Sequence, residues 1–444
     1  MMIILDERLQ ATLNGAVKDH QKDAKDFTVP ASFHFMIGSF TGEHDIQVAH
    51  LVPCPQPPRD GPVNHTNDAI KRMDTEFLAE HADRVIRMLP GGVDLVGIVL
   101  ISEEKKVLPL LKPVLLQVLQ GVAKAATADS TFNLFKYITH MALVSIDGAE
   151  GKQQGFLADV SHREGSFSAN KISFDKLQWT TIISRIGGRV SGHVPLKSND
   201  FTKDLRQMLQ HRVQQILDCQ LILIDDVVRN SDDLLIKDQK HKKQSYELAL
   251  MVQSECDIDA ASTIESETAN NWHDFVFDVE VRAAVPVKSK VKDAVAAVKL
   301  HVIRNFSARG ALVADLMDVT EEKTFPTTQI IHQMPRPATT FLPSQPAIIF
   351  SDFLFEAEGP EDARENFKDT LGLDVNLENV DDGWERSLAI DEMEVVRAKE
   401  VVPDHAPLIT TSPENPSQRL PYLIVAMSMM MVLVSWILYR TLAS

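Results

Sequence analysis

Hydrophobic and polar residues in the first 225 positions alternate with the periods of both strands and helices. The runs "SFHFMIGSF" and "HDIQVAHLVP" predict two paired strands around a turn at residues 41–43. The amphipathic stretch "NDAIKRMDTEFLAEHADRVIRMLP" predicts a helix that Asn67 caps and residues 90–92, Pro-Gly-Gly, terminate. The apolar run "VDLVGIVLI" then predicts a strand buried on both faces.

The pattern continues with elements of both kinds. "VLPLLKPVLLQVLQGVAKAA" predicts a second helix, with Pro109 and Pro113 restricting its start. "YITHMALVSID" and "GFLADVS" predict strands, "DFTKDLRQMLQHRVQQIL" a third helix and "CQLILIDDVV" a last strand. Strands and helices in this order predict an α/β sandwich over residues 1–226.

The second half begins where this periodicity decays. Residues 227–271 contain a basic run, "KDQKHKKQ", and an acidic, hydroxyl-rich stretch, "SECDIDAASTIESETANN", that has no aromatic residue. This composition predicts a mobile insertion. Residues 272–400 resume with the strand "DFVFDVEVRAAVPV", the helix "KVKDAVAAVKLHVIRNFSARGALVADLM", the strand "QPAIIFSDFLF" and the helix "EDARENFKDTLG". They predict a smaller second α/β part, and residues 401–419, with four prolines, a stalk.

Charge is concentrated near the end of this second part. Residues 351–400 hold 16 acidic and 5 basic side chains, and the whole chain has a formal net charge of −17. Such a balance disfavours binding to nucleic acid or to anionic lipid. The acidic stretch is interpreted as a solvated surface, with a docking surface for a basic partner as the alternative.

The residues 420–439 form an uncharged apolar run of 20 positions, which as a helix spans about 30 Å. Aromatic rings near its two ends and flanking arginines are typical of a transmembrane helix. The amino-terminal "MMIILDERLQ" lacks the features of a secretory signal, so we expect a tail anchor with the rest of the chain in the cytosol. The anchor residues are Leu420, Pro421, Tyr422, Trp436, Tyr439, Arg419 and Arg440.

Cysteine usage agrees with a cytosolic location. Cys54, Cys219 and Cys256 are far apart in the sequence, which predicts reduced thiols rather than a disulfide framework. The glycosylation sequons that begin at Asn64 and Asn305 are therefore expected to remain unmodified.

Candidate chemistry is sparse. The stretch 148–153, "GAEGKQ", ends like a phosphate-binding loop but lacks the glycine and the hydroxyl residue that such a loop needs. Asp225 and Asp226 follow an apolar strand, where they either hold a divalent cation or mark the strand's exit. The histidines are scattered, and His81 is interpreted as a packed or surface residue of its helix. No metal or other cofactor is predicted.

One stretch of the sequence resembles the MPN domain. It comprises "MIGSFTGEHDIQVAHLVPCP", a helix and "MLPGGVDLVGIVLISEE", with Gly97 at the glycine of the metal-binding strand. The resemblance places Leu100 and Ser102 where the domain's histidines would be, and Leu110 and Pro113 where its serine and aspartate would be. These side chains cannot bind zinc. The resemblance therefore implies an MPN-like sandwich that lacks the metal motif, a type of domain that serves as a dimerising or scaffolding half.

The chain as a whole resembles the odorant response abnormal protein 4 family. The residues that carry this resemblance are "MLPGGVDLVGIVLIS", "HMALVSIDGAEGK", "QMPRPATTFLPSQPAIIFSDFLFE" and the C-terminal apolar run. It implies a non-enzymatic, tail-anchored protein of the endoplasmic reticulum membrane, with transport vesicles as a further location. Such a protein assists folding and export of odorant and other seven-helix receptors to cilia, and it recruits the protease of the ubiquitin-fold modifier.

A tethered adaptor is the interpretation favoured by the residues too, because tethering raises the local concentration of whatever the protein binds. The competing class is a hydrolase with an unrecognised active site, for which Asp225, Asp226 and His140 are the first candidates. A tether or fusion factor would need long heptad repeats, and no run of three heptads is present in the sequence. Charged positions of the helix "EFLAEHADRVIRML" form the candidate partner surface: Glu76, Glu80, Arg84 and Arg87.

Overall fold

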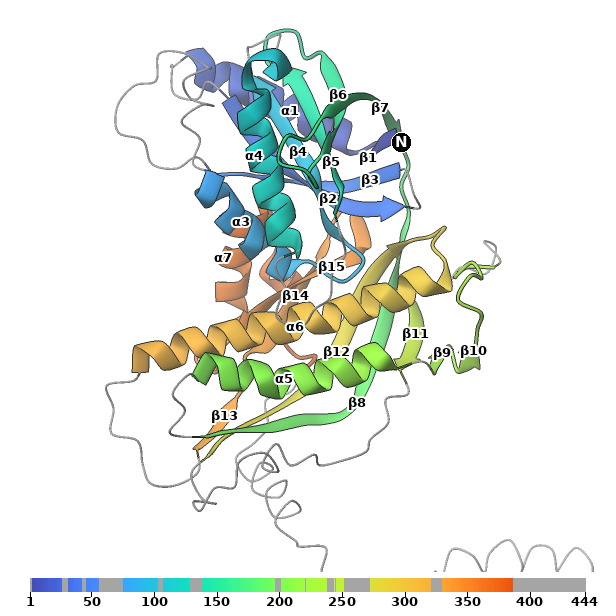
Figure 1. Cartoon of the computed structure of the whole chain (residues 1–444), viewed down its shortest axis with the longest axis vertical. Coiled ribbons are helices and arrows are strands. Elements are labelled where there is room, and N and C mark those ends of the chain that lie inside the picture. The colour runs from blue at the N-terminus through green and yellow to red at the C-terminus, as the bar shows by residue number, and fades with distance from the viewer. Residues whose placement is uncertain are drawn as a thin grey trace, which may run out of the picture. The chain divides into compact units, whose positions relative to one another are not determined.

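The protein was analysed as a computed structural model, shown in Figure 1. The structure describes residues 2–25, 31–41, 45–55, 75–102, 107–127, 138–195, 201–219, 221–237, 243, 245–250, 272–320 and 330–385. All of these belong to one compact unit. The unit is a mixed α/β fold, as the sequence predicts.

Seven strands of the N-terminal half close into a barrel in the order β1-β3-β2-β4-β5-β6-β7. The strands are β1 (Met2–Asp6), β2 (Ala31–Thr41), β3 (Asp45–Pro53), β4 (Asp94–Ser102), β5 (His140–Asp147), β6 (Gln153–Asp159) and β7 (Phe167–Asp175). All nine residues of β4 are buried, so the prediction of a strand covered on both faces is confirmed. Its antiparallel neighbour β2 and parallel neighbour β5 place it in the middle of the sheet.

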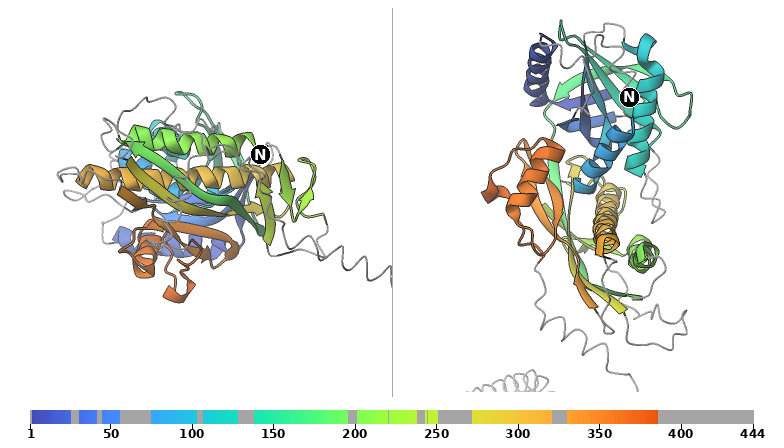
Figure 2. Two further views of the ribbon diagram at one scale, coloured as in Figure 1. Left: turned by 90° about the horizontal axis from the view of Figure 1, so that it is seen from below. Right: turned by 90° about the vertical axis from the view of Figure 1, so that its left-hand side faces the viewer.

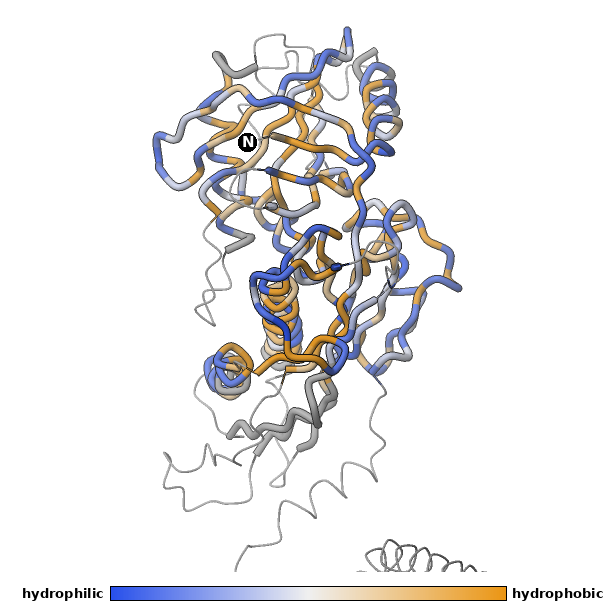
Figure 3. Tube along the Cα trace, turned by 90° about the vertical axis from the view of Figure 1, so that its right-hand side faces the viewer, coloured by the Kyte–Doolittle hydropathy of each residue, from blue (hydrophilic) through white to orange (hydrophobic). Residues whose placement is uncertain are grey.

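Three helices cover the two faces of these strands. The helix α1 (Leu9–Lys25) packs with Leu9 and Leu13 on one face, against the core that contains Ile3 and Val99. The helices α3 (Thr75–Met88) and α4 (Val107–Thr127) pack on the opposite face, and strands and helices alike show long hydrophobic stretches (Figure 3). Since successive residues of a strand point to opposite faces, the apolar residues 95–101 of β4 contribute to both cores. The helix α1 was not among the predicted elements.

A second sheet has six strands in the order β10-β9-β11-β8-β12-β13. They are β8 (Trp179–Pro195), β9 (Ile222–Ile224), β10 (Val227–Val228), β11 (Ser245–Leu250), β12 (Trp272–Pro286) and β13 (Ile330–Gln333). The amphipathic helix α5 (Phe201–Asp218) and the long helix α6 (Val291–Thr320) lie side by side on one face (Figures 1 and 2).

This sheet crosses the domain boundary that the sequence suggests near residue 226. The strand β8 lies before that position and β12 after it, yet the two pair antiparallel along 14 residues. The strands β10 and β11 also fall within residues 227–271, the expected insertion, of which residues 251–271 lie outside the described ranges. Strand pairing between segments this distant leaves no mark on local periodicity, so the boundary cannot be located from local patterns.

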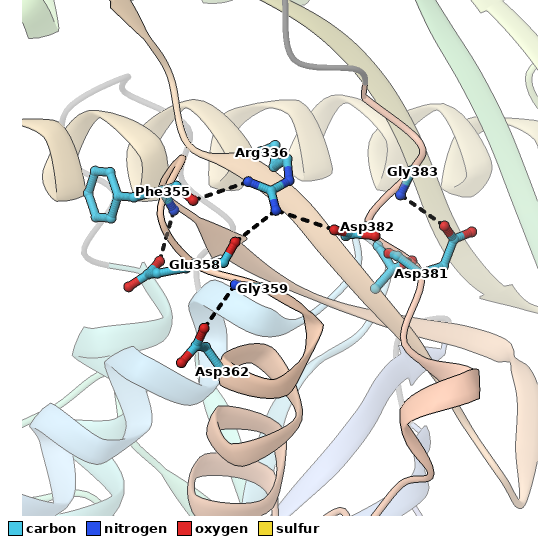
Figure 4. A network of polar contacts seen from close by, with 9 residues as sticks. Arg336, Phe355, Glu358, Gly359, Asp362, Asp381, Asp382 and Gly383 are labelled. Carbon is cyan, nitrogen blue, oxygen red and sulfur yellow. Dashed lines mark hydrogen bonds and ion pairs between the residues drawn. The ribbon is translucent and has the colours of Figure 1, made fainter.

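A third, smaller layer consists of the hairpin β14 (Arg336–Leu342) and β15 (Gln345–Leu354), the helix α7 (Pro360–Leu371) and the short helix η4 (Leu377–Asn379). Phe350 and Phe367 of this layer are fully buried in the same core as α3 and α4. Arg336 fastens the layer by donating to the carbonyl oxygens of Phe355 at 3.1 Å and Glu358 at 2.8 Å, and it pairs with Asp382 (Figure 4).

The barrel and the second sheet meet at the loop that the sequence marks as Pro-Gly-Gly. The amide of Gly91 donates to Nδ1 of His301 on α6 at 3.0 Å, and Arg304 donates to the carbonyl oxygens of Pro90 and Val93. A side chain at Gly91 would overlap the carbonyl oxygen of Ala297 in α6. Glycine is therefore required at this position because two backbones approach too closely for a Cβ atom.

A buried ion pair secures the last described residues. Arg309 on α6 is fully buried, and its Nη2 atom pairs with Oε2 of Glu385, which is 5 % exposed. Oε1 of Glu385 also accepts a hydrogen bond of 3.0 Å from the amide of Glu280 on β12. This acidic residue belongs to the stretch interpreted as a solvated surface, but it serves as a core contact.

Candidate functional site

The predicted partner surface lies on α3. Glu76, Glu80, Arg84 and Arg87 are all exposed, whereas Leu78, Ala82 and Val85 on the other side of the helix are buried. This division follows from the helical spacing of the apolar residues. The structure thus brings the four predicted residues together along the solvent-facing side of one helix.

Salt bridges hold this side of α3. Nη2 of Arg84 lies 2.7 Å from Oε1 of Glu80, and Nη2 of Arg87 lies 2.7 Å from Oδ2 of Asp83. Both pairs are solvent-exposed, so each contributes at most about 1 kcal/mol to stability. The α3 surface therefore presents acidic and basic side chains in fixed positions. Such charges affect the rate and the specificity of association with a partner more than its affinity.

The helix is fixed firmly beneath this surface. It packs against α4. A Cβ atom placed on Gly121 of α4 would lie 3.7 Å from Cβ of Ala79 on α3. His81 is buried and stacks on Phe35 of β2, with ring centroids 5.6 Å apart. Burial lowers the pKa of His81, which agrees with its interpretation as a packed residue.

The positions that the resemblance to the MPN domain aligns with metal ligands lie on two different elements. Leu100 and Ser102 are fully buried on β4, while Leu110 and Pro113 belong to α4. Across the described ranges, no three His, Cys, Asp or Glu side chains gather in a way that could hold a metal ion.

The candidates for a hydrolase lie in different sheets. Asp225 and Asp226 form the turn between β9 and β10, with left-handed φ angles of 48° and 64°. His140 begins β5 in the barrel, where its Nδ1 atom lies 2.9 Å from the hydroxyl of Thr139. The structure therefore does not bring the three side chains together, and it identifies the two aspartates as turn residues, which tolerate positive φ.

The stretch "GAEGKQ" connects β5 to β6 as a tight turn. Its last residue begins β6, and the amide of Gly151 donates to the carbonyl oxygen of Asp147 at 2.7 Å. A phosphate-binding loop leads into a helix whose N-terminus faces the phosphate, whereas this turn leads into a strand. The geometry thus favours a hairpin turn.

Three histidines whose pKa is lowered by burial are called the neutral histidines: His34 and His50, which are half-buried, and His301, which is buried. Burial lowers the pKa of His34 and of His50 to about 4, and that of His301 to about 3, from an ordinary value of 6.5. The ring of His50 is hydrogen-bonded at 3.3 Å to the carbonyl oxygen of Leu371, and His301 accepts from Gly91. His50 and His301 thus act as structural contacts between layers of the fold.

An exposed apolar surface at the edge of the second sheet was not predicted. Its members are Leu221, 52 % exposed, and Val228, 65 % exposed, together with half-buried Leu223 and Ala249. We call these four residues the hairpin face. The run "CQLILIDDVV" gives the only sequence signal, because a strand that reaches an acidic pair and then two valines can turn back as a hairpin.

The predicted membrane anchor, from Arg419 to Arg440, lies outside the described residues. Within the described ranges, none of the helices has the length and apolar character needed to cross a bilayer.

Comparison with known proteins gives consistent matches. The model of the family described as "Odorant response abnormal 4-like" matches residues 35–382. "Odorant response abnormal protein 4" of Caenorhabditis elegans is 38% identical over 402 residues, which cover 89% of this chain and 84% of that protein. "Protein odr-4 homolog" of Mus musculus is 22% identical and covers 86% of both chains, and its Homo sapiens counterpart is 21% identical over 80% and 81%.

Among solved structures, the crystal structure of UfSP from C. elegans is similar with a TM-score of 0.40 and 9% sequence identity. The similarity covers 84% of this chain and 56% of that one.

Proposed function

The chain belongs to the odorant response abnormal 4-like family, and from this membership we propose that it is a membrane-tethered adaptor for receptor export. In this role it assists the folding of odorant and other seven-helix receptors in the endoplasmic reticulum and their transport to cilia. The single observation that carries the proposal is the 38% identity to "Odorant response abnormal protein 4", which extends over most of both chains.

Tethering is the physical basis of the proposed activity. The apolar run Leu420–Tyr439, flanked by Arg419 and Arg440, anchors the protein in the endoplasmic reticulum membrane and in vesicles derived from it, with the folded body in the cytosol. An anchored body meets membrane-bound clients at a much higher effective concentration than a free one.

The proposal includes a second partner, the protease of the ubiquitin-fold modifier, which the adaptor recruits to the membrane. We assign this contact to the α3 surface of an MPN-like scaffolding domain, because α3 presents a fixed pattern of charge on a rigid helix. Support for an adaptor over a hydrolase comes from the separate positions of Asp225 and Asp226 in one sheet and His140 in another.

Removal of the anchor tests the central claim. In cells that lack the protein, the full chain should restore delivery of an odorant receptor to the cilium, whereas a chain ending at Gln418 should be released from membranes and should not restore it. Receptor delivery by the truncated chain, at matched expression, would contradict tethering as the basis of function.

Charge reversal on α3 tests the second partner. Arg84→Glu with Arg87→Glu should weaken co-purification of the protease by about 2 kcal/mol or more if these residues are central to the contact. Arg163→Glu, which changes an exposed arginine elsewhere on the barrel, is the matched control. Equal co-purification by both variants would place the protease contact elsewhere.

A further inference from the structure

The hairpin face is a continuous apolar row across three strands. Val228 of β10 lies opposite Leu223 of β9, which in turn lies opposite Ala249 of β11. Directly opposed residues share one face of a sheet, so Val228, Leu223 and Ala249 form one row. Leu221 directly precedes β9 and adds a further exposed apolar side chain next to that strand.

On the opposite face the protein's own core covers β9 and β11, whereas Val227 of β10 is 58 % exposed. Ile224 is 2 % exposed and Leu248 is 1 % exposed, and both pack in the core beneath α5 and α6. The core thus supports β9 and β11 from behind, while Leu221 and Val228 are exposed to solvent, each by more than half.

An acidic corner adjoins the row. Asp225 in the hairpin turn is engaged, since Oδ2 accepts from Nζ of Lys243 at 2.8 Å and Oδ1 accepts from the amide of Glu247 at 3.1 Å. Asp226 is next to it in the turn, and exposed Glu247 lies two residues before Ala249 on the same face of β11. Within the described part of the chain, no basic group pairs with the carboxylates of Asp226 and Glu247. Among the described side chains of the corner, three carboxylates, of Asp225, Asp226 and Glu247, stand against one ammonium group, that of Lys243.

A surface of this kind is complementary to an apolar segment that ends in basic residues. The cytosolic end of a transmembrane helix has this chemistry, because cytosolic loops of membrane proteins are enriched in Lys and Arg next to the apolar span. We propose that the hairpin face and its acidic corner bind such a juxtamembrane segment of a seven-helix receptor. The inference rests on the proposed function, in which these receptors are the clients.

Two other occupants fit less well. An anionic lipid surface would be repelled by the carboxylates of Asp226 and Glu247 next to the row. Pairing with a second copy would bring two like-charged corners toward each other, which opposes association. The charge at the corner thus distinguishes a basic receptor segment from both.

A binding measurement on the full chain in detergent micelles tests the proposal. The probe is a fluorescent peptide from the third cytoplasmic loop of an odorant receptor, with the last apolar turn of the preceding helix. A matched peptide carries Gln in place of each Lys and Arg. Leu221→Ser and Val228→Ser should each weaken binding of the first peptide at least fivefold, whereas Leu377→Ser, at an exposed leucine elsewhere, should leave it unchanged.

Charge specificity provides the second measurement. The wild-type chain should bind the Gln peptide at least fivefold more weakly, and Asp226→Asn, which tolerates the same left-handed φ, should reduce this preference while leaving the thermal midpoint unchanged. Binding that Leu221→Ser and Val228→Ser do not alter, or no binding by the wild-type chain, would overturn the assignment. So would an effect of these variants on binding to phosphatidylserine vesicles or on sedimentation as a dimer, in place of an effect on peptide binding.

The failure of this inference is distinguishable from failure of the proposed function. If the hairpin variants deliver receptors normally while the chain ending at Gln418 does not, the hairpin face is the wrong surface and the adaptor role stands. If the truncated chain also delivers receptors normally, the adaptor role itself fails.

Discussion

Replacing Glu385 by alanine should destabilise the fold far more than the position's place in an acidic stretch suggests. Arg309 is the largest fully buried side chain of the described residues, and Glu385 supplies its carboxylate partner. Removing one member of a buried ion pair leaves the other charge without compensation, which costs about 3–5 kcal/mol. The amide of Glu280 also loses its acceptor, so a value near the upper end, about 5 kcal/mol, is expected.

A loss of this size is a large fraction of the total stability of a typical protein, about 5–15 kcal/mol. Urea unfolding of the full chain in a mild detergent, followed by circular dichroism, measures it as a shift of the midpoint at constant slope. The Glu80→Ala variant is a matched control, because its pair with Arg84 is more than 60 % exposed on both sides. That variant should lose less than about 1 kcal/mol.

A double mutant separates the buried charge from other effects of the substitution. Arg309→Met combined with Glu385→Leu removes both charges and should recover at least half of the lost stability, since replacing both members by apolar groups is often nearly neutral. The reasoning is refuted if Glu385→Ala costs no more than Glu80→Ala, or if the double mutant is less stable than Glu385→Ala alone.

Three further perturbations follow from the described contacts. Gly91→Ala should lower the free energy of unfolding in urea by about 3 kcal/mol, because a Cβ atom there overlaps the backbone of α6. Gly121→Ala should change it by less than about 1 kcal/mol. Equal losses in the two variants would contradict the close approach of Gly91 to α6. Between pH 6.5 and 4 the unfolding free energy should fall as pH falls, because the unfolded chain protonates the neutral histidines and the folded chain does not. The variant His34→Leu should lower this slope by about 1.4 kcal/mol per pH unit, and an unchanged slope would show that His34 titrates normally. Asn305, 2 % exposed on α6, should show no glycosidase-sensitive shift in gel mobility, whereas a sequon appended after Ser444 should show one; a glycan on Asn305 would reverse the proposed topology.

A group with the opposite sign of pH dependence partly offsets the histidines. Burial raises the pKa of Asp352 to about 6 from an ordinary value of 3.8, and Glu358 adds repulsion. Below pH 6 the folded chain therefore takes up a proton at Asp352 before the unfolded chain does, which favours folding. For Asp352 and the three neutral histidines together, the net uptake on unfolding near pH 5 is about two protons.

The local sequence determined the elements that are long and strongly patterned. The apolar run at residues 95–101 is buried on both faces within β4, and the helix expected from residue 290 is α6. The amphipathic spacing in α3 likewise identified its buried and exposed sides, because a helix brings residues three and four apart to one face. For these elements, contacts within a few turns of chain contain the necessary information.

Tertiary structure alone decided the features that depend on distant pairing. The partnership of β8 with β12 crosses the expected domain boundary, and Glu385 is buried only because Arg309 lies opposite it. Similarly, the apolar row of the hairpin face exists because Val228, Leu223 and Ala249 come into register across three strands. Register between strands is set by the whole set of packed neighbours. From the sequence alone, the residues of the hairpin face therefore resemble an ordinary strand, and Glu385 resembles part of an acidic, solvated segment.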